Sequence, residues 1–201
     1  MDKKFIIVLV ALVLSVTCTI GVTLAWLVDT TGPVTNTFTV GDIEITLDEA
    51  PVNLYGEVVA GNRRTENTYK LIPAHEYTKD PTVHVQVGSE PCWVFVKVEN
   101  NIAAIEGDTT IAAQIAANDW TELTSAAGEN YKVYYKENVD AREEAKDLKV
   151  FEKITIANNA TLYDNDGNAL YSASTPVIIT AYAIQDDGLG TAADAWTALG
   201  N

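Results

Sequence analysis

The sequence predicts a mainly β protein: an antiparallel β-sandwich with short helical insertions, preceded by an apolar N-terminal signal helix. Three observations support this prediction. Apolar and polar residues alternate in several short runs, which places one row of side chains on each face of a sheet. Clusters of Gly, Asn, Asp and Pro separate these runs at spacings typical of sandwiches. The leader carries no charged residue between Phe5 and Val28.

Composition and charge indicate an exported protein. The chain has 201 residues and a formal net charge of −15, a length that suits one domain plus a leader. Lys3, Lys4 and Asp2 give the leader one net positive charge, so the remainder carries −16. Such an acidic surface repels nucleic acid and anionic membranes. It suits an extracellular protein, and it either collects divalent cations weakly or only keeps the protein in solution.

The leader has the form of a signal peptide. Lys3 and Lys4 make a short positive region before the apolar stretch, and Ala25 supplies the small residue required before a cut. We therefore predict cleavage between Ala25 and Trp26.

This cut divides the chain into a signal peptide over residues 1–25 and one exported domain over residues 26–201. The alternative is an uncleaved anchor, because the 24 residues from 5 to 28 are long enough to span a hydrocarbon core of ~30 Å. No positive cluster follows them, which favours removal.

The two cysteines predict no intramolecular disulfide. Cys18 lies in the leader, so its removal leaves Cys92 without a partner, although an exported protein would permit a disulfide. Cys92 lies in an alternating run and is expected to be a small, buried apolar residue. The alternatives are a reactive thiol or an intermolecular bridge.

The first predicted strand covers residues 38–47, and Gly41 interrupts its alternation as a bulge or bend would. Residues 52–72 predict a long surface loop or a ragged hairpin. Within this loop, Arg63 and Arg64 form the one basic pair of the predicted exported domain. We expect a solvated loop, with docking on an acidic neighbour as the alternative.

The strongest strand signal lies near the middle of the chain. Val83, Val85 and Val87 alternate with polar residues, and residues 88–91 predict a connection. Residues 92–98 are apolar on both faces, so this strand belongs in the middle of a packed sheet or under a covering loop. One face of it carries Cys92, Val94, Val96 and Val98, and the other carries Trp93 and Phe95.

A short helix follows, because Ile111 and Ile115 are four residues apart; we expect it to begin near Asp108 or Thr109 as N-cap and to end before Asn118. The later predicted elements are a strand over 131–135, a turn of helix over 141–146, a strand over 148–156, a hairpin turn over 164–167, a strand over 177–184, and a terminal helix over 191–199 capped by Thr191.

Several motifs resemble one family. They are Ala-Trp-Leu-Val-Asp at 25–29, Asn-Thr-Phe-Thr-Val-Gly at 36–41, Lys-Asp-Pro-Thr-Val at 79–83, the stretch 88–98, and Ala-Tyr-Ala-Ile-Gln at 181–185. With these motifs the chain resembles the TasA/camelysin family of Gram-positive bacteria, secreted proteins whose precursors are processed by the signal peptidase SipW.

The resemblance implies a jelly-roll-like sandwich and a secreted subunit of extracellular biofilm-matrix fibres. In that family the new N-terminal segment adds as a strand to the next subunit, which is β-augmentation of an open sheet edge. Here we expect the donor strand to lie within residues 26–38, with Trp26, Val28, Val34 and Phe38 as its anchors. The alternative is that this segment pairs within its own sheet and the protein stays monomeric.

The family resemblance also implies partners for the chain. They are other copies of the chain, SipW during export, and an accessory matrix protein, with no nucleic acid and with a membrane only before cleavage. The implied location is the extracellular matrix or the cell surface.

A metallopeptidase of the camelysin type is one alternative function. Its zinc motif requires two His four residues apart with a Glu between them, but His75 and Glu76 are followed by Lys79. We expect His75 to be a loop residue and His84 a solvent-facing strand residue. The run from Asp164 to Gly167 lacks the full ligand set of a calcium loop. We therefore expect no catalytic residue, no metal and no cofactor.

A monomeric surface adhesin or binding module is the other alternative. Its binding face would need exposed aromatic side chains. We expect the aromatic residues to fill the core instead; they include Trp93, Trp120, Tyr131, Tyr134 and Tyr135.

Overall fold

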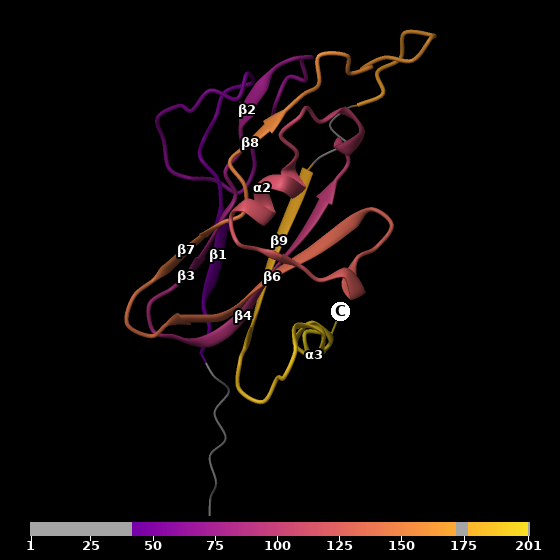
Figure 1. The fold of residues 1–201 in the computed structure, drawn as a ribbon. Coiled ribbons are helices and arrows are strands. Elements are labelled where there is room, and N and C mark those ends of the chain that lie inside the picture. The colour runs from indigo at the N-terminus through magenta and orange to yellow at the C-terminus, as the bar shows by residue number, and fades with distance from the viewer. Residues whose placement is uncertain (1–41, 172–176, 201) are drawn as a thin grey trace, which may run out of the picture. The chain divides into compact units, whose positions relative to one another are not determined.

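Antiparallel strands dominate the structure, a computed structural model that describes residues 42–171 and 177–200 (Figure 1). The largest sheet has the order β5 (Thr121–Glu122), β6 (Tyr131–Ala141), β4 (Ser89–Asn100), β9 (Val177–Gln185). A second sheet has the order β1 (Ile45–Asp48), β3 (Thr82–Val85), β7 (Lys146–Lys149), and a third pairs β2 (Glu76–Thr78) with β8 (Lys153–Thr155). The helices are short: η1 (Ala103–Ile105), α2 (Ile111–Ala117), η2 (Thr124–Ala126) and α3 (Ala192–Ala198). The predicted mainly β, antiparallel class is confirmed.

Strand β4 is central, as its two apolar faces predict. It lies between β6 and β9. Cys92, Val94, Val96 and Val98 are buried in the main core, together with residues of β3 and α2. This core therefore joins the two larger sheets.

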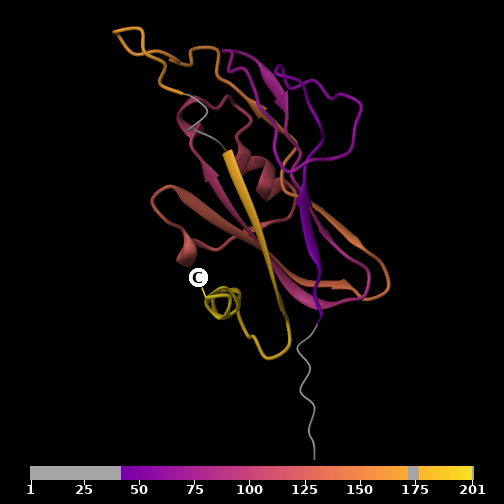
Figure 2. The same ribbon diagram turned by 180° about the vertical axis from the view of Figure 1, so that it is seen from behind.

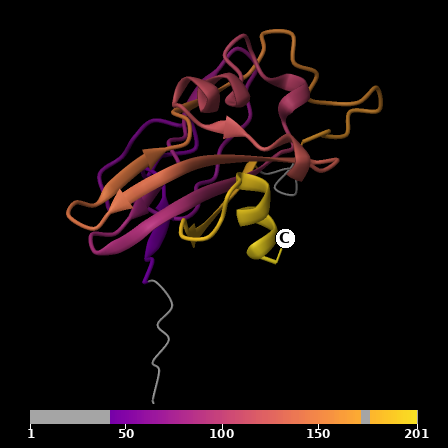
Figure 3. The same ribbon diagram turned by 60° about the horizontal axis from the view of Figure 1, so that its bottom comes forward.

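The second face of β4 is covered by α3, which Figure 3 shows lying against the large sheet. Trp93 and Phe95 pack there with Trp196 of the helix. Thr191 caps α3 as predicted, since its side chain accepts a hydrogen bond from the Asp194 backbone N–H at 3.2 Å.

The other predicted helix is also present, with a different cap. The side chain of Thr110, and not Asp108 or Thr109, accepts the Ala113 N–H at 3.1 Å. Ile111 and Ile115 are buried as their spacing predicts.

Three sequence predictions are wrong: one about a connection, one about a helix and one about a strand. The predicted connection over 88–91 is shorter, because β4 begins at Ser89 and Glu90 donates its N–H to the Asp42 carbonyl at 3.1 Å. Residues 142–145 form the turn between β6 and β7 and no helix, with Arg142 paired to Asp140 at 2.7 Å.

The third error is the single strand over 148–156. Val150 and Phe151 are both fully buried, and two consecutive buried side chains break the alternation of a strand. The segment therefore splits into β7 and β8, which belong to different sheets.

Cys92 is a buried free thiol, as predicted. Burial raises its pKa to about 11, which keeps the thiol protonated and unreactive at neutral pH. Cys18, Phe38, Val40 and Gly41 lie outside the described residues. Within the described part of the chain, no helix is long and apolar enough to cross a membrane.

Candidate functional site

The candidate site is the space between the edges of β1 and β9, where Cα atoms of the two strands come within 8 Å of each other. In the second sheet, the Gln86 N–H donates to the Glu44 carbonyl. This bond and the register of β1 with β3 leave the backbone groups of Ile45 and Leu47 facing away from β3. In the large sheet, the Asp186 N–H donates to the Pro91 carbonyl, which in the same way turns the backbone of alternate β9 residues away from β4. These β9 residues include Val177, Ile179, Ala181 and Ala183.

The two edges face each other and run in opposite directions. They come together where β1 begins and β9 ends. There the Asp42 carbonyl accepts a hydrogen bond from the Glu90 N–H, and the Asp186 N–H donates to the carbonyl of the next residue of β4, Pro91. Figure 2 shows β1 and β9 diverging from that point. Among the described residues, the outward backbone groups of Ile45, Leu47, Ile179 and Ala181 have no hydrogen-bond partner. We call this feature the strand-edge groove.

The β9 edge is unprotected, in contrast to the far edge of the second sheet. Edge strands of soluble proteins are usually short or carry charges that block pairing with another chain. Strand β7 meets that description with Lys146, Asp147 and Lys149 in four residues. Strand β9 has nine residues, none of them charged, and none of its side chains is fully buried. The apolar Ile178 is 41% exposed.

The wider end of the strand-edge groove opens into a cavity of about 800 Å³. Its apolar wall combines β1 and β9 with residues from three other segments, and the side chains that form it are Leu47, Leu71, Ile154, Tyr171, Val177 and Ile179. Several of these side chains are only partly buried although they pack against the main core. A cavity of this size and polarity accommodates apolar side chains of an incoming segment.

A buried polar cluster forms the opposite wall of the cavity. The Glu49 residue is 3% exposed, and its Oε2 lies 2.5 Å from Lys79 Nζ. Asn67 Nδ2 donates to Glu49 Oε1 at 2.8 Å. The backbone of Glu49 pairs with that of Arg64, which holds the long loop against the end of β1.

A second charged cluster lies beside the groove and joins all three strands of its sheet. His84 of β3 contacts Asp48 of β1 at 2.9 Å and Asp147 of β7 at 2.6 Å. Arg63 contacts Asp48 at 2.5 Å and Asp80 at 2.9 Å. The solvated-loop prediction is therefore wrong for Arg63, which docks on acidic neighbours, and His84 is paired and only 21% exposed at its side chain.

These contacts shift two pKa values in opposite directions. Partial burial alone would raise the pKa of Asp48, but its hydrogen bonds with Arg63 and His84 outweigh burial and leave the pKa below its ordinary value. Burial alone would lower the pKa of His84, but its bonds to Asp48 and Asp147 outweigh burial and leave the pKa raised.

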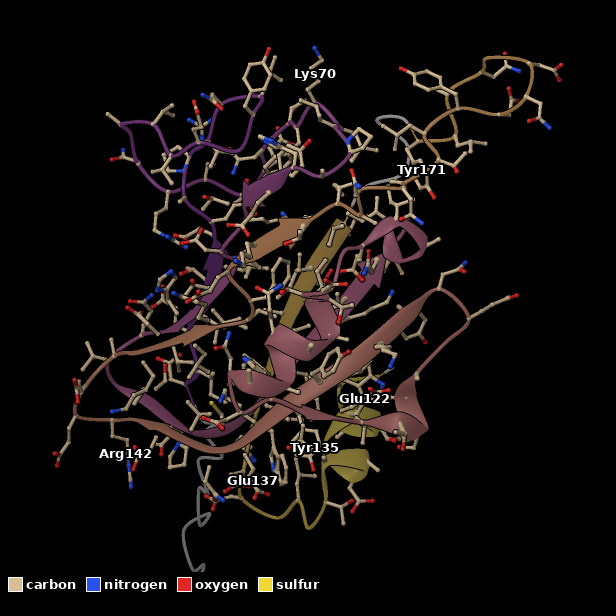
Figure 4. The ribbon with its side chains drawn as sticks, turned by 45° about the horizontal axis from the view of Figure 1, so that its top comes forward. Lys70, Glu122, Tyr135, Glu137, Arg142 and Tyr171 are labelled. Atoms are coloured by element: carbon tan, nitrogen blue, oxygen red, sulfur yellow. The ribbon has the colours of Figure 1, made fainter. Side chains whose placement is uncertain are left out.

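Most of the large exposed apolar side chains of the described residues lie at the end of the molecule where the groove is widest. Six large ones belong to the loop over 52–72 and the hairpin over 162–171; they are Leu54, Tyr55, Val58, Val59, Tyr163 and Leu170. We call these residues the apolar tip. Figure 4 shows Lys70 of the loop and Tyr171 of the hairpin at this same end.

The structure separates the residues considered for chemistry. His75 Nε2 lies 2.8 Å from the Tyr55 carbonyl, and Glu76 pairs with Lys153 at 2.7 Å. The described residues contain no group of three or more His, Cys, Asp or Glu side chains arranged to hold a metal. Asp164 accepts hydrogen bonds from the backbone of Asp166 and Asn168, which closes the predicted hairpin turn.

The aromatic residues divide between core and surface. Trp93, Trp120 and Tyr134 are buried, as predicted, whereas Tyr131 and Tyr135 are partly exposed. The predicted cleavage residues and donor anchors, namely Ala25, Trp26, Val28, Val34 and Phe38, lie outside the described residues.

Strand periodicity does not predict the strand-edge groove. Residues 177–184 are apolar on both faces and uncharged, which predicts a covered strand. The structure instead places this strand at an edge.

No protein-family model, curated protein or solved structure matches the chain.

Proposed function

We propose that the chain is a secreted structural subunit that assembles into extracellular biofilm-matrix fibres by donor-strand addition. The donor is the segment 26–38 of one copy, and the acceptor is the strand-edge groove of the next. The observation that carries this proposal is the long, uncharged and incompletely covered edge of β9 facing the free edge of β1. The proposal includes a jelly-roll-like arrangement of the sandwich and a signal helix over residues 1–25, cut between Ala25 and Trp26.

Donor-strand addition would satisfy the outward backbone groups of β9. Cα atoms of β1 lie within 8 Å of those of β9, and a strand paired with both would need about 10 Å between them, so β1 would have to move away for the donor to pair with it as well. A strand inserted between β1 and β9 would be parallel to one and antiparallel to the other, because those strands run in opposite directions. Trp26 and Val28 are two residues apart, and Val34 and Phe38 are four apart, so each pair shares a face of an extended segment. Full burial of one such side chain contributes roughly 1.5–3 kcal/mol.

The geometry favours head-to-tail growth. β1 begins at the end of the molecule away from the apolar tip, and the donor segment directly precedes β1 in the chain (Figure 1). The segment 26–41 spans up to roughly 50 Å when extended. A heterologous contact of this kind produces a filament when the rotation between successive copies does not close a ring. The exposed apolar side chains of the tip lie on two separate segments, the loop and the hairpin (Figure 1), and each offers apolar contacts to a neighbouring subunit.

A monomeric binding module is the second candidate, and the same apolar tip is the observation in its favour. In that case the segment 26–38 would occupy the groove of its own molecule, and the tip would bind a different partner. The two candidates differ in the oligomeric state of the processed protein.

The test compares the processed protein, residues 26–201, with a truncated form, residues 42–201. We expect filaments from the first in electron micrographs and a folded monomer from the second by circular dichroism and size-exclusion chromatography. A synthetic peptide of residues 26–41 should bind the truncated form and raise its melting temperature. Filaments from the truncated form would refute the donor assignment, and a monomer from the processed form at every concentration would favour the binding module.

A further inference from the structure

Lys79 and Asn67 share one buried carboxylate. Lys79 Nζ lies 2.5 Å from Oε2 of Glu49, and Asn67 Nδ2 lies 2.8 Å from its Oε1. The side chains of Lys79 and Glu49 are 11% and 4% exposed. The amine and the amide nitrogen are therefore neighbours around a single carboxylate, and the amide carbon is bonded directly to one of them.

The simplest interpretation of this cluster is a structural ion pair, but a buried ion pair contributes little to the stability of the folded protein. Removing two charges from water costs several kcal/mol per ion, and apolar residues of the same volume often stabilise a protein as well or better. The other Lys–Glu pairs of the described residues lack this arrangement. In particular, the pairs Lys132–Glu122 and Lys149–Glu152 are exposed, and no Asn amide contacts either carboxylate.

The cluster contains each group that acyl transfer requires. A lysine amine becomes a nucleophile when it is desolvated and a base removes its proton, and Glu49 is in contact with Nζ. The backbone N–H of Val52 donates to Asn67 Oδ1 at 3.1 Å, where it would stabilise negative charge on the oxygen of a tetrahedral intermediate. Asn67 Nδ2 also donates to the Ala50 carbonyl at 2.8 Å, so the amide is held at three points.

We propose that Lys79 and Asn67 form an intramolecular amide crosslink, with Glu49 as the proton shuttle. Glu49 takes a proton from the Lys79 ammonium, and the neutral amine attacks Cγ of Asn67. The Nζ–Cγ bond forms and the Cγ–Nδ2 bond breaks. Glu49 returns this proton to Nδ2, which leaves as ammonia, and Glu49 then takes up and keeps the second proton lost by Nζ. One amine and one primary amide give one secondary amide and ammonia, with no oxidation or reduction.

The position of the cluster suits this reaction. Glu49, Asn67 and Lys79 all line the cavity at the wide end of the strand-edge groove, which gives ammonia a route to solvent. The crosslink would tie the loop over 52–72 to the segment entering β3, and so fix one wall of the groove. It forms within one molecule and does not depend on fibre assembly.

The mass of the intact secreted protein tests the proposal. The crosslinked protein should be lighter than its sequence by about 17 Da, the mass of ammonia. After trypsin digestion, residues 65–70 and 71–97 should appear as one branched peptide, because a modified Lys79 resists cleavage. The variants Lys79→Arg, Glu49→Gln and Asn67→Ala should each restore the full mass, and Lys132→Arg, at an exposed Lys–Glu pair, should keep the deficit.

The wild-type protein alone decides the outcome, whether or not the variants fold. A secreted protein of full sequence mass, with free tryptic peptides 71–79 and 80–97, would overturn the crosslink. That result would leave fibre formation untouched, and a crosslinked monomer would count against the fibre proposal only.

Discussion

Replacing Ala181 with proline tests whether the free edge of β9 is the acceptor. Proline removes the backbone N–H that points into the strand-edge groove, and its ring occupies the space of an incoming strand. The folded subunit should tolerate this change, because that N–H has no partner among the described residues. Lys149→Pro is the matched control, since the Lys149 N–H points outward from the charged edge of β7 in the same way.

The expected effect on assembly follows from one lost hydrogen bond per contact. A net contribution of about 0.5–1.5 kcal/mol corresponds to a rise in the critical concentration for assembly of about twofold to tenfold, and the proline ring adds to it. Sedimentation of filaments over a range of concentrations measures this value, and calorimetry measures the melting temperature. An equal effect of the two prolines on assembly would refute the edge assignment. A large fall in melting temperature for Ala181→Pro alone would show that its N–H is already paired.

Three further predictions concern stability. His84→Gln should lower the free energy of unfolding by about 0.5–1 kcal/mol at about pH 5–6, and by less as pH rises through the raised pKa of His84 or falls through the lowered pKa of Asp48; urea unfolding at several pH values measures this, and a pH-independent loss would contradict it. Phe95→Ala should cost about 3–5 kcal/mol, because Phe95 is fully buried under α3; a cost below about 1 kcal/mol would show that the helix does not cover this face. Gly56→Ala should destabilise far more than Gly167→Ala. Both residues have positive φ, but a Cβ on Gly56 would lie 2.6 Å from Tyr77 Cα, whereas none of the described atoms lies within 4 Å of one on Gly167.

Local sequence patterns predicted the elements whose burial depends on the spacing of their own side chains. Residues 92–98 are apolar on both faces, and β4 is covered on both faces. Thr191 lies three residues before Asp194, and it caps α3. Strands β2 and β5 were missed because two or three residues are too short to show a period.

The candidate site was less predictable, because it depends on which strands are neighbours. Nothing in residues 177–184 tells whether the strand is central or at an edge. Arg63 finds Asp48 and Asp80 across the chain, and Glu49, Asn67 and Lys79 come from three segments. Periodicity carries no information about such pairings, since they are set by the long-range arrangement of the sheets.

The edge strands β7 and β9 differ in charge, and this difference would limit the shape of an assembly of the protein. The charged side chains of β7 disfavour pairing of that edge with another chain. The uncharged edge of β9 would have no free backbone groups once one donor strand pairs with it. If one donor strand fills the β9 edge of each copy, as proposed, β9 has no free edge left for a second donor, and a fibre built in this way would not branch at β9.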